Sequence, residues 1–180
     1  MIDLNHIVIR YRLGLFDTEA LIHIADKLLE EGRHTPSVVK LSILVLESPI
    51  MAEAAPLFEK ACVELGVAIP SQQEAINKLL HFQIESIASG AIAPQEGLEA
   101  MMRELYFPFI IAEPCKKYVG DSHGMEHLIG AYWNYDDLVG HPNEVSWEGK
   151  YGAEAIACWE EFVRQKARGW LQIHSPLSKH

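Results

Sequence analysis

Residues 71–90, SQQEAINKLLHFQIESIASG, carry the clearest structural signal of this 180-residue chain. Ser71 and Glu74 form a capping box, in which the serine hydroxyl and the glutamate carboxylate each accept a hydrogen bond from a free backbone N–H. Gly90 follows the last apolar position, as is common at the end of a helix. The apolar side chains between them recur at helical spacing, and they are Ala75, Ile76, Leu79, Leu80, Ile84 and Ile87. The stretch therefore predicts one amphipathic helix.

Similar signals predict helices along most of the chain. Asp17 is expected to cap a helix that ends at Gly32, and Pro36 follows the capping residue Thr35 at a second helix start. Further helices are expected after Pro49 and from Pro94 to Leu105. A long helix from about Gly149 to Trp170 is expected to bury Ala153, Ile156, Ala157, Val163, Ala167 and Trp170.

The run Val38–Leu46 is apolar nearly all round and is interrupted only by Lys40 and Ser42. This composition favours a central buried helix, although the β-branched residues leave a strand open as the alternative.

The helical signal is weaker in the middle of the chain. Pro108 and Pro114 break helical hydrogen bonding, so residues 106–114 are expected to be extended or irregular. We expect a single all-α domain over residues 1–180, either an antiparallel helical bundle or an irregular helical array. An irregular insertion rich in acids and aromatics is expected near residues 106–148, and the tail 172–180 is expected to fray.

Composition excludes several classes of function. The net charge is −10, and the negative charge is shared equally between the two halves of the chain. No basic half or arm is available to neutralise phosphates, which argues against binding to nucleic acid or to an anionic membrane surface. No signal peptide and no uncharged apolar stretch long enough to span a bilayer is seen, so we expect a cytoplasmic protein.

The three cysteines are odd in number and widely spaced, which is typical of a reducing compartment. Cys62 and Cys158 fall on the apolar side of helical patterns and are expected in the core. Cys115 lies beside Lys116 and Lys117, whose charges would lower the pKa of its thiol, so it is a candidate reactive thiol.

The segment 118–163 contains nine carboxylates and a single cation, Lys150, with large aromatic residues between them. Such a surface suits binding to a basic protein, because charge steers the encounter and aromatic rings supply anchors. The alternative is a solvated acidic face whose aromatics point into the core. The candidate binding residues are the anchors Tyr132, Trp133, Tyr135 and Trp147 and the acids Asp136, Asp137, Glu144 and Glu148.

Asp136 and Asp137 form a carboxylate pair beside these aromatics. The pair is able to bind a metal, an amine or an arginine. The sequence Asn134-Tyr135-Asp136-Asp137 is also good turn chemistry, and the two interpretations are compatible.

The sequence His123-Gly-Met-Glu-His127 fits the inverted zinc-protease pattern, in which two histidines share a metal and the glutamate activates water. In a looser version, Asp121, His123 and His127 bind zinc or another divalent metal, with Asp136, Asp137 or His141 completing the ligand shell. Glu126 would then act as general base. The competing interpretation needs no cofactor: Asp121 and Ser122 cap a helix that carries both histidines.

Two further segments, 87–101 (IASGAIAPQEGLEAM) and 10–17 (RYRLGLFD), resemble small all-α bacterial proteins of largely uncharacterised families. Some members of these families accompany polymorphic or contact-dependent toxins and are proposed to be immunity proteins. The resemblance implies an all-α fold and no catalytic activity, and it assigns no functional residue.

These observations lead to three hypotheses. The first is a non-enzymatic binding protein, such as an immunity protein that neutralises a basic toxin through the acidic and aromatic residues named above. The second is a metal-dependent hydrolase that uses Asp121, His123, Glu126 and His127. The third is a structural homo-oligomer, such as a homodimer in which the aromatics of residues 132–159 pack against a second copy.

Overall fold

The structure is a computed structural model that describes residues 2–44, 51–114, 117–118 and 121–174. It confirms the all-α fold: the described residues contain helices and no strand, with one isolated backbone pairing between Trp147 and Lys150. The chain divides into two compact units, Met1–Leu79 and Leu80–His180, and the boundary falls within helix α5 (Gln72–Ser89). The two units are described separately, and the single-domain interpretation stays a prediction.

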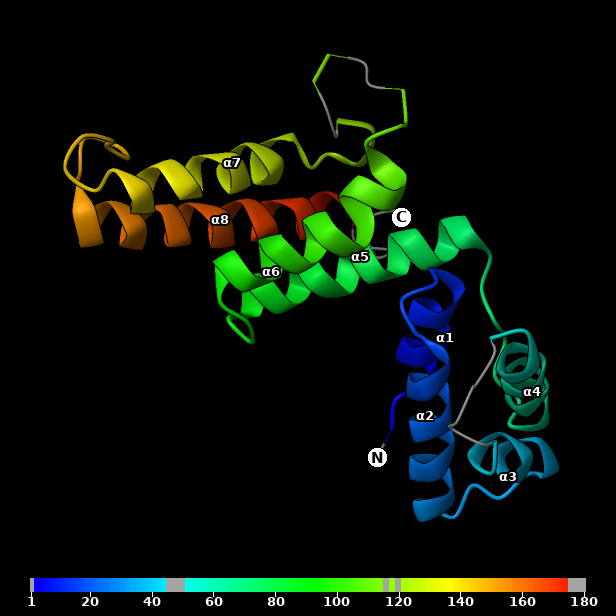
Figure 1. The fold of residues 1–180 in the computed structure, drawn as a ribbon. Helices are drawn as coiled ribbons and strands as arrows, with labels where there is room; N and C mark the ends of the chain where they lie inside the picture. The colour runs from blue at the N-terminus through cyan, green and yellow to red at the C-terminus, as the bar shows by residue number, and fades with distance from the viewer. Residues whose placement is uncertain (1, 45–50, 115–116, 119–120, 175–180) are drawn as a thin grey trace. The chain divides into compact units, whose positions relative to one another are not determined.

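The first unit contains helices α1 (Leu4–Arg12), α2 (Thr18–Glu30), α3 (Pro36–Ser42) and α4 (Met51–Glu64), labelled in Figure 1. They enclose an apolar core to which each of them contributes. Its most deeply buried large side chains include Leu21, Leu28, Leu41 and Phe58.

The predicted helix starts are confirmed where a polar side chain caps the helix. Asp17 accepts a hydrogen bond from the backbone N–H of Ala20 at 2.8 Å, and Thr35 accepts one from Val38 at 3.3 Å. In α5 the backbone N–H of Ser71 donates to Glu74 at 2.9 Å, and the N–H of Glu74 donates to the Ser71 hydroxyl at 3.3 Å. The predicted apolar positions of α5 are all buried.

Helix α1 was not predicted from the sequence. Asp3 caps it by accepting hydrogen bonds from Asn5 and His6, and Leu4 and Val8 are its buried side chains. The signal that could have revealed it is the aspartate followed by apolar residues four apart.

The run Val38–Leu46 begins as a helix, because α3 covers its first five residues and ends at Ser42. The prediction that it is buried all round was wrong. Val38 and Leu41 are buried, whereas Val39 is exposed and 71% of the Ile43 surface is accessible. A helix this short packs along one side only, so its other apolar residues face solvent. Residues 45–46, and the restart expected at Ser48 and Pro49, lie outside the described residues.

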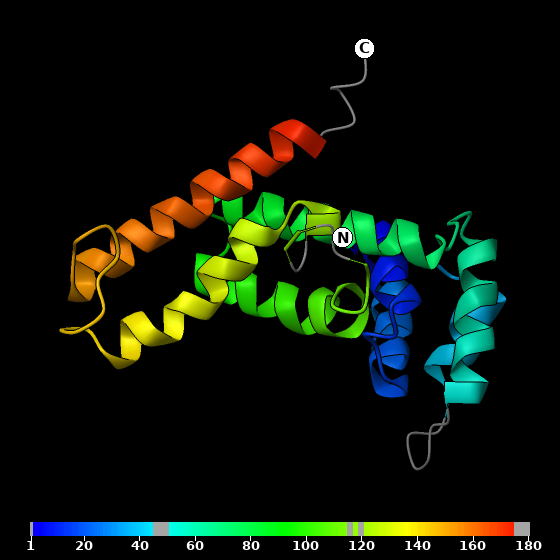
Figure 2. The ribbon, with the colours of Figure 1, turned by 90° about the horizontal axis from the view of Figure 1, so that it is seen from above.

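The second unit contains helix α6 (Pro94–Met101), a π-helix over Met102–Ile110, a 3₁₀ turn at Asp121–His123, and helices α7 (Glu126–Gly140) and α8 (Gly152–His174). Helices α7 and α8 lie side by side, joined by the loop 141–151 (Figure 1), and the view from above in Figure 2 shows the same pair.

The prediction of irregular chain near residues 106–148 was wrong in two places. Residues 106–110 continue the helix in π form, with Ile111 donating to the carbonyl of Tyr106 at 2.9 Å. In a π-helix each N–H bonds the carbonyl five residues earlier. Helices depart from the regular α form at prolines and at such π segments, and Pro108 lies within this one. Residues 126–140 form α7, because Leu128, Ile129, Ala131 and Leu138 give it a buried side. The turn expected at Asn134–Asp137 is therefore helix.

Helix α8 differs from the prediction at both ends. Its buried residues are Ala155, Trp159, Val163, Ala167 and Trp170, so the expected burial of Ala153 and Ala157 was wrong. The helix starts at Gly152, and large Trp159 rather than the small alanines fills the core on its first turns. Residues 172–174 of the expected frayed tail are helical, and residues 175–180 lie outside the described residues.

Candidate functional site

Four of the predicted binding residues lie together on α7, and one aromatic residue of the π-helix contacts them. Trp133 is 55% exposed, and its ring meets Phe107, which is 46% exposed, edge to face at 6.3 Å. Tyr132 contacts Trp133 in the same manner at 5.1 Å. Asp136 and Asp137 follow three and four residues after Trp133, one helical turn further along the same side of the helix. We call Phe107, Tyr132, Trp133, Asp136 and Asp137 the α7 face.

The carboxylates of the α7 face are exposed, and the structure shows no ion pair for either Asp136 or Asp137 within the described part of the chain. They also lie near the C-terminal end of α7, where the helix dipole is negative and where no basic residue offsets them. Both features are unfavourable for the isolated protein and favourable for contact with a cation.

A small notch of about 30 Å³ opens beside the α7 face, between α6 and α7. Tyr135 packs against the buried indole of Trp159 with ring centroids 4.6 Å apart. Partial burial raises the pKa of the Tyr135 hydroxyl, and the nearby carboxylates of Glu160, Glu99 and Asp136 raise it further. The notch contains two carboxylates and no basic residue in its lining, which consists of Gln95, Leu98, Glu99, Tyr132, Tyr135, Asp136 and Trp159.

The other predicted binding residues lie on the loop after α7. Glu144 and Glu148 are exposed, whereas Trp147 is half-buried with its ring edge-on to Phe162 at 5.2 Å. Trp147 and Lys150 exchange two backbone hydrogen bonds across Glu148 and Gly149, which both have positive φ. This is the geometry of a tight type I′ turn, so Trp147 supports the loop more than it offers an exposed anchor.

The structure does not assemble the predicted metal ligands. The carboxylate of Asp121 accepts hydrogen bonds from the backbone N–H groups of Lys117 and Tyr118, at 2.6 and 2.9 Å. His123 is paired through Nε2 with Glu113 at 2.9 Å. His127 is exposed. No group of three or more His, Cys, Asp or Glu side chains among the described residues is arranged to hold a metal ion, and the metal hypothesis stays a prediction.

Sequence reasoning missed a second pocket of the same unit, about 570 Å³ in volume, at the start of α7. One carboxylate oxygen of Glu126, Oε2, is buried there without a hydrogen-bond partner. The ring of His174 stacks on Trp170 at 4.2 Å, and its Nδ1 donates to the Trp170 carbonyl at 2.9 Å. No sequence motif joins these residues, because α7 and α8 bring them together from distant positions.

Of the cysteines, Cys62 is buried in the first unit, as predicted, and burial raises the pKa of its thiol to about 11. Cys158 is half-buried. The candidate reactive thiol, Cys115, lies outside the described residues.

Comparison of the chain with known protein families, with curated proteins and with solved structures found no match. The resemblance to immunity proteins therefore stays a prediction. No helix in the described part of the chain combines the length and the apolar character that a membrane span requires.

Proposed function

We propose that this chain is a non-enzymatic, cytoplasmic binding protein that recognises a basic protein partner through the α7 face. The observation that carries the proposal is the pairing of an exposed aromatic couple, Trp133 and Phe107, with the exposed carboxylates of Asp136 and Asp137. Aromatic side chains at the centre of an interface supply most of its binding energy, and complementary charge speeds association.

The placement of the two aspartates supports a role in binding. Acidic side chains near the C-terminal end of a helix destabilise it by about 0.3–1 kcal/mol each at exposed positions. A local feature that opposes folding without a compensating contact in the same molecule is typical of a functional surface. A lysine or arginine of a partner would supply the missing positive charge.

The notch beside the α7 face extends the same chemistry. Tyr132 and Tyr135 line it with aromatic side chains, and Glu99 and Asp136 line it with carboxylates, which together suit a cationic group. A toxin that attacks nucleic acid is basic, so an immunity protein with such a surface would associate rapidly with it. We therefore propose a basic toxin as the partner.

The first test compares wild-type protein with the double variant Asp136→Lys with Asp137→Lys as baits in a lysate of the source organism. A single basic partner is expected on the wild-type bait and is expected to be lost from the variant. The matched control is Asp26→Lys with Glu30→Lys, which makes the same change in net charge at two exposed positions of α2. The control bait is expected to retain the partner.

The second test separates steering from anchoring once the partner is purified. The double lysine variant is expected to slow association at low ionic strength, because the loss of steering acts on the association rate. Trp133→Ala is expected to accelerate dissociation at all salt concentrations, because the loss of an anchor acts on the lifetime of the complex. Unchanged affinity in both variants would remove the α7 face from the proposal.

Sedimentation tests the homo-oligomer alternative on the same samples. A dimer that persists on dilution and dissociates in Trp133→Ala would mean that the α7 face binds a second copy of this chain.

A further inference from the structure

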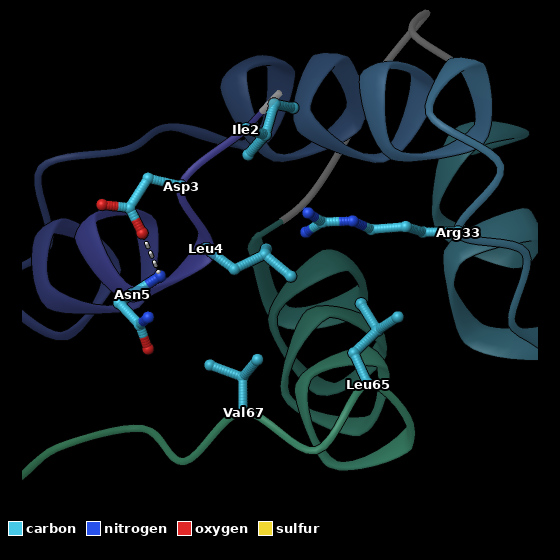
Figure 3. A pocket seen from close by; sticks show the side chains of 7 residues that line it. All are labelled: Ile2, Asp3, Leu4, Asn5, Arg33, Leu65 and Val67. Atoms are coloured by element: carbon cyan, nitrogen blue, oxygen red, sulfur yellow. Dashed lines mark hydrogen bonds between the residues drawn. The ribbon is translucent and has the colours of Figure 1, made fainter.

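Three helix ends of the first unit surround an open pocket of about 590 Å³ (Figure 3). The start of α1 contributes Ile2, Asp3, Leu4 and Asn5, the end of α2 contributes Arg33, and the end of α4 contributes Leu65 and Val67. Most of the wall is apolar, and Arg33 is the only cation among the residues that line the pocket.

Two helix-ending motifs of the same kind hold the wall in place. Gly32 has a φ of 78°, its N–H donates to Leu29, and the N–H of Arg33 donates to Leu28 at 2.9 Å. At the end of α4, Gly66 has a φ of 71°, and the N–H of Val67 donates to Cys62 at 2.9 Å. Both are Schellman motifs, and each fixes the backbone of the residue that follows its glycine. Arg33 and Val67 therefore project from rigid backbone into one pocket.

The guanidinium of Arg33 is only partly committed within the protein. Its Nε lies 3.5 Å from Oε2 of Glu31, and 29% of its side chain is exposed. Figure 3 shows the two terminal nitrogens pointing into the pocket, toward the side formed by Ile2 and Leu4. Within the described part of the chain neither terminal nitrogen has a hydrogen-bond partner. These two N–H groups form the fork that binds a carboxylate through two parallel hydrogen bonds.

We propose that this pocket binds a carboxylate that carries an apolar group, with Arg33 holding the carboxylate and Ile2, Leu4, Leu65 and Val67 contacting the apolar part. A monoanion fits the local charge better than a phosphate. Arg33 supplies one positive charge, while Asp3 on the opposite wall and Glu31 beside the guanidinium repel an anion, and they would repel a phosphate dianion more strongly than a monoanion. Asp3 is itself committed to capping α1. This binding site is separate from the α7 face and does not depend on the function proposed for it.

Two sources supply this chemistry: a free carboxylic acid, or the C-terminal residue of a peptide that ends in an apolar side chain. The test uses hexanoate as the probe for the first and N-acetylleucine for the second. Each has a neutral partner of similar shape, 1-hexanol and N-acetylleucinamide. Titrations of the full chain are followed by the methyl NMR signals of Leu4, Leu65 and Val67.

At least one acid is expected to shift these signals saturably and to bind at least about tenfold more tightly than its neutral partner, because only the acid forms charge-assisted hydrogen bonds with Arg33. Tighter binding of hexanoate identifies the free acid as the source, and tighter binding of N-acetylleucine identifies the peptide end. Either result supports the shared chemistry.

The decisive variant is Arg33→Gln, which is expected to weaken binding of the acid at least about tenfold while the remaining methyl spectrum is unchanged. The matched control is Arg12→Gln, at an exposed arginine of α1 that does not line the pocket, and it is expected to bind like wild type. Equal affinity for acid and neutral partner, unchanged binding in Arg33→Gln, or no saturable shift with either acid would each overturn the proposal.

Discussion

Helix α5 begins with a reciprocal capping box, whereas helix α7 begins after Met125, whose side chain makes no capping hydrogen bond. The apolar residues of α5 follow one regular stripe, and all the predicted positions are buried. Helix α7 instead carries Asp136 and Asp137 near its C-terminal end and no basic residue in its last turn. The difference indicates that the helical form of α5 is specified by its own sequence, while that of α7 depends on its packing neighbours.

The largest expected effect concerns the contact that holds α7. Trp159 is fully buried, packs against Tyr135, and donates from Nε1 to the carbonyl of Ala131 at 2.9 Å. Trp159→Ala is expected to lower the free energy of unfolding by about 3–5 kcal/mol, because it leaves a cavity and removes the hydrogen bond to Ala131. Denaturant unfolding measures the change.

The control for Trp159→Ala is Trp133→Ala, which removes the same side chain from the exposed side of α7. It is expected to change the free energy of unfolding by no more than about 0.5–1 kcal/mol. Equal losses in the two variants would show that α7 does not depend on its buried contact with α8.

The second prediction concerns the capping box at the start of α5. Ser71→Ala removes the hydroxyl that accepts from the N–H of Glu74, and it is expected to cost about 1 kcal/mol. Hydrogen exchange of the first-turn amides of α5 measures the loss. Ser86→Ala is the control, because the Ser86 hydroxyl donates to Phe82 inside the helix and contributes no cap. That variant is expected to be neutral or slightly stabilising.

The contrast between α5 and α7 also explains what the sequence predicted. Capped helices such as α2, α3 and α5 were predicted because their signals lie within a few residues of each other. Helix α7 was predicted as irregular chain, since it has no capping signal and its buried side is defined by packing against α8 and α6. The candidate binding acids and aromatics were found from composition alone, but composition does not separate Trp133, which faces solvent, from Trp147, which packs against Phe162.

The Arg33 pocket also separates what local sequence predicts from what depends on packing. Gly32 was predicted to end a helix, and it does; Gly66 ends α4 in the same way. That the residues after them line one pocket depends on how three helices of the first unit pack together, and this information is not local to any stretch of sequence.

The third prediction concerns how far the acidic residues near the end of α7 lower the free energy of unfolding. Asp137→Asn is expected to raise the free energy of unfolding by about 0.3–1 kcal/mol, because it removes a negative charge from the negative end of the helix dipole. Glu154→Gln at the first turn of α8 is the control, and it is expected to destabilise by a similar amount, since an acid there is favourable. The change is measured by thermal unfolding at low salt.

In a binding assay the Asp137→Asn variant is expected to associate more slowly with a basic partner although it is the more stable protein. A variant that is both more stable and equally active would indicate that Asp137 belongs to a solvated surface rather than to a binding face.

The smallest expected effect is the response of Tyr135 to its carboxylate neighbours. Burial raises the pKa of its hydroxyl above its ordinary value of 10.0, and Glu160, Glu99 and Asp136 add to the increase. A tyrosine whose pKa is higher in the folded protein contributes stability that is complete below pH 10 and is lost as the pH rises through the raised pKa. Asp136→Asn removes one of the opposing charges, so the pKa of Tyr135 is expected to fall toward its ordinary value, as followed by NMR of ring-labelled tyrosine. Asp26→Asn, in the first unit, is expected to leave it unchanged. An unchanged pKa in Asp136→Asn would mean that burial and the charges of Glu160 and Glu99 set it. The Asp136 carboxylate would then act on a partner only from the exposed side of α7.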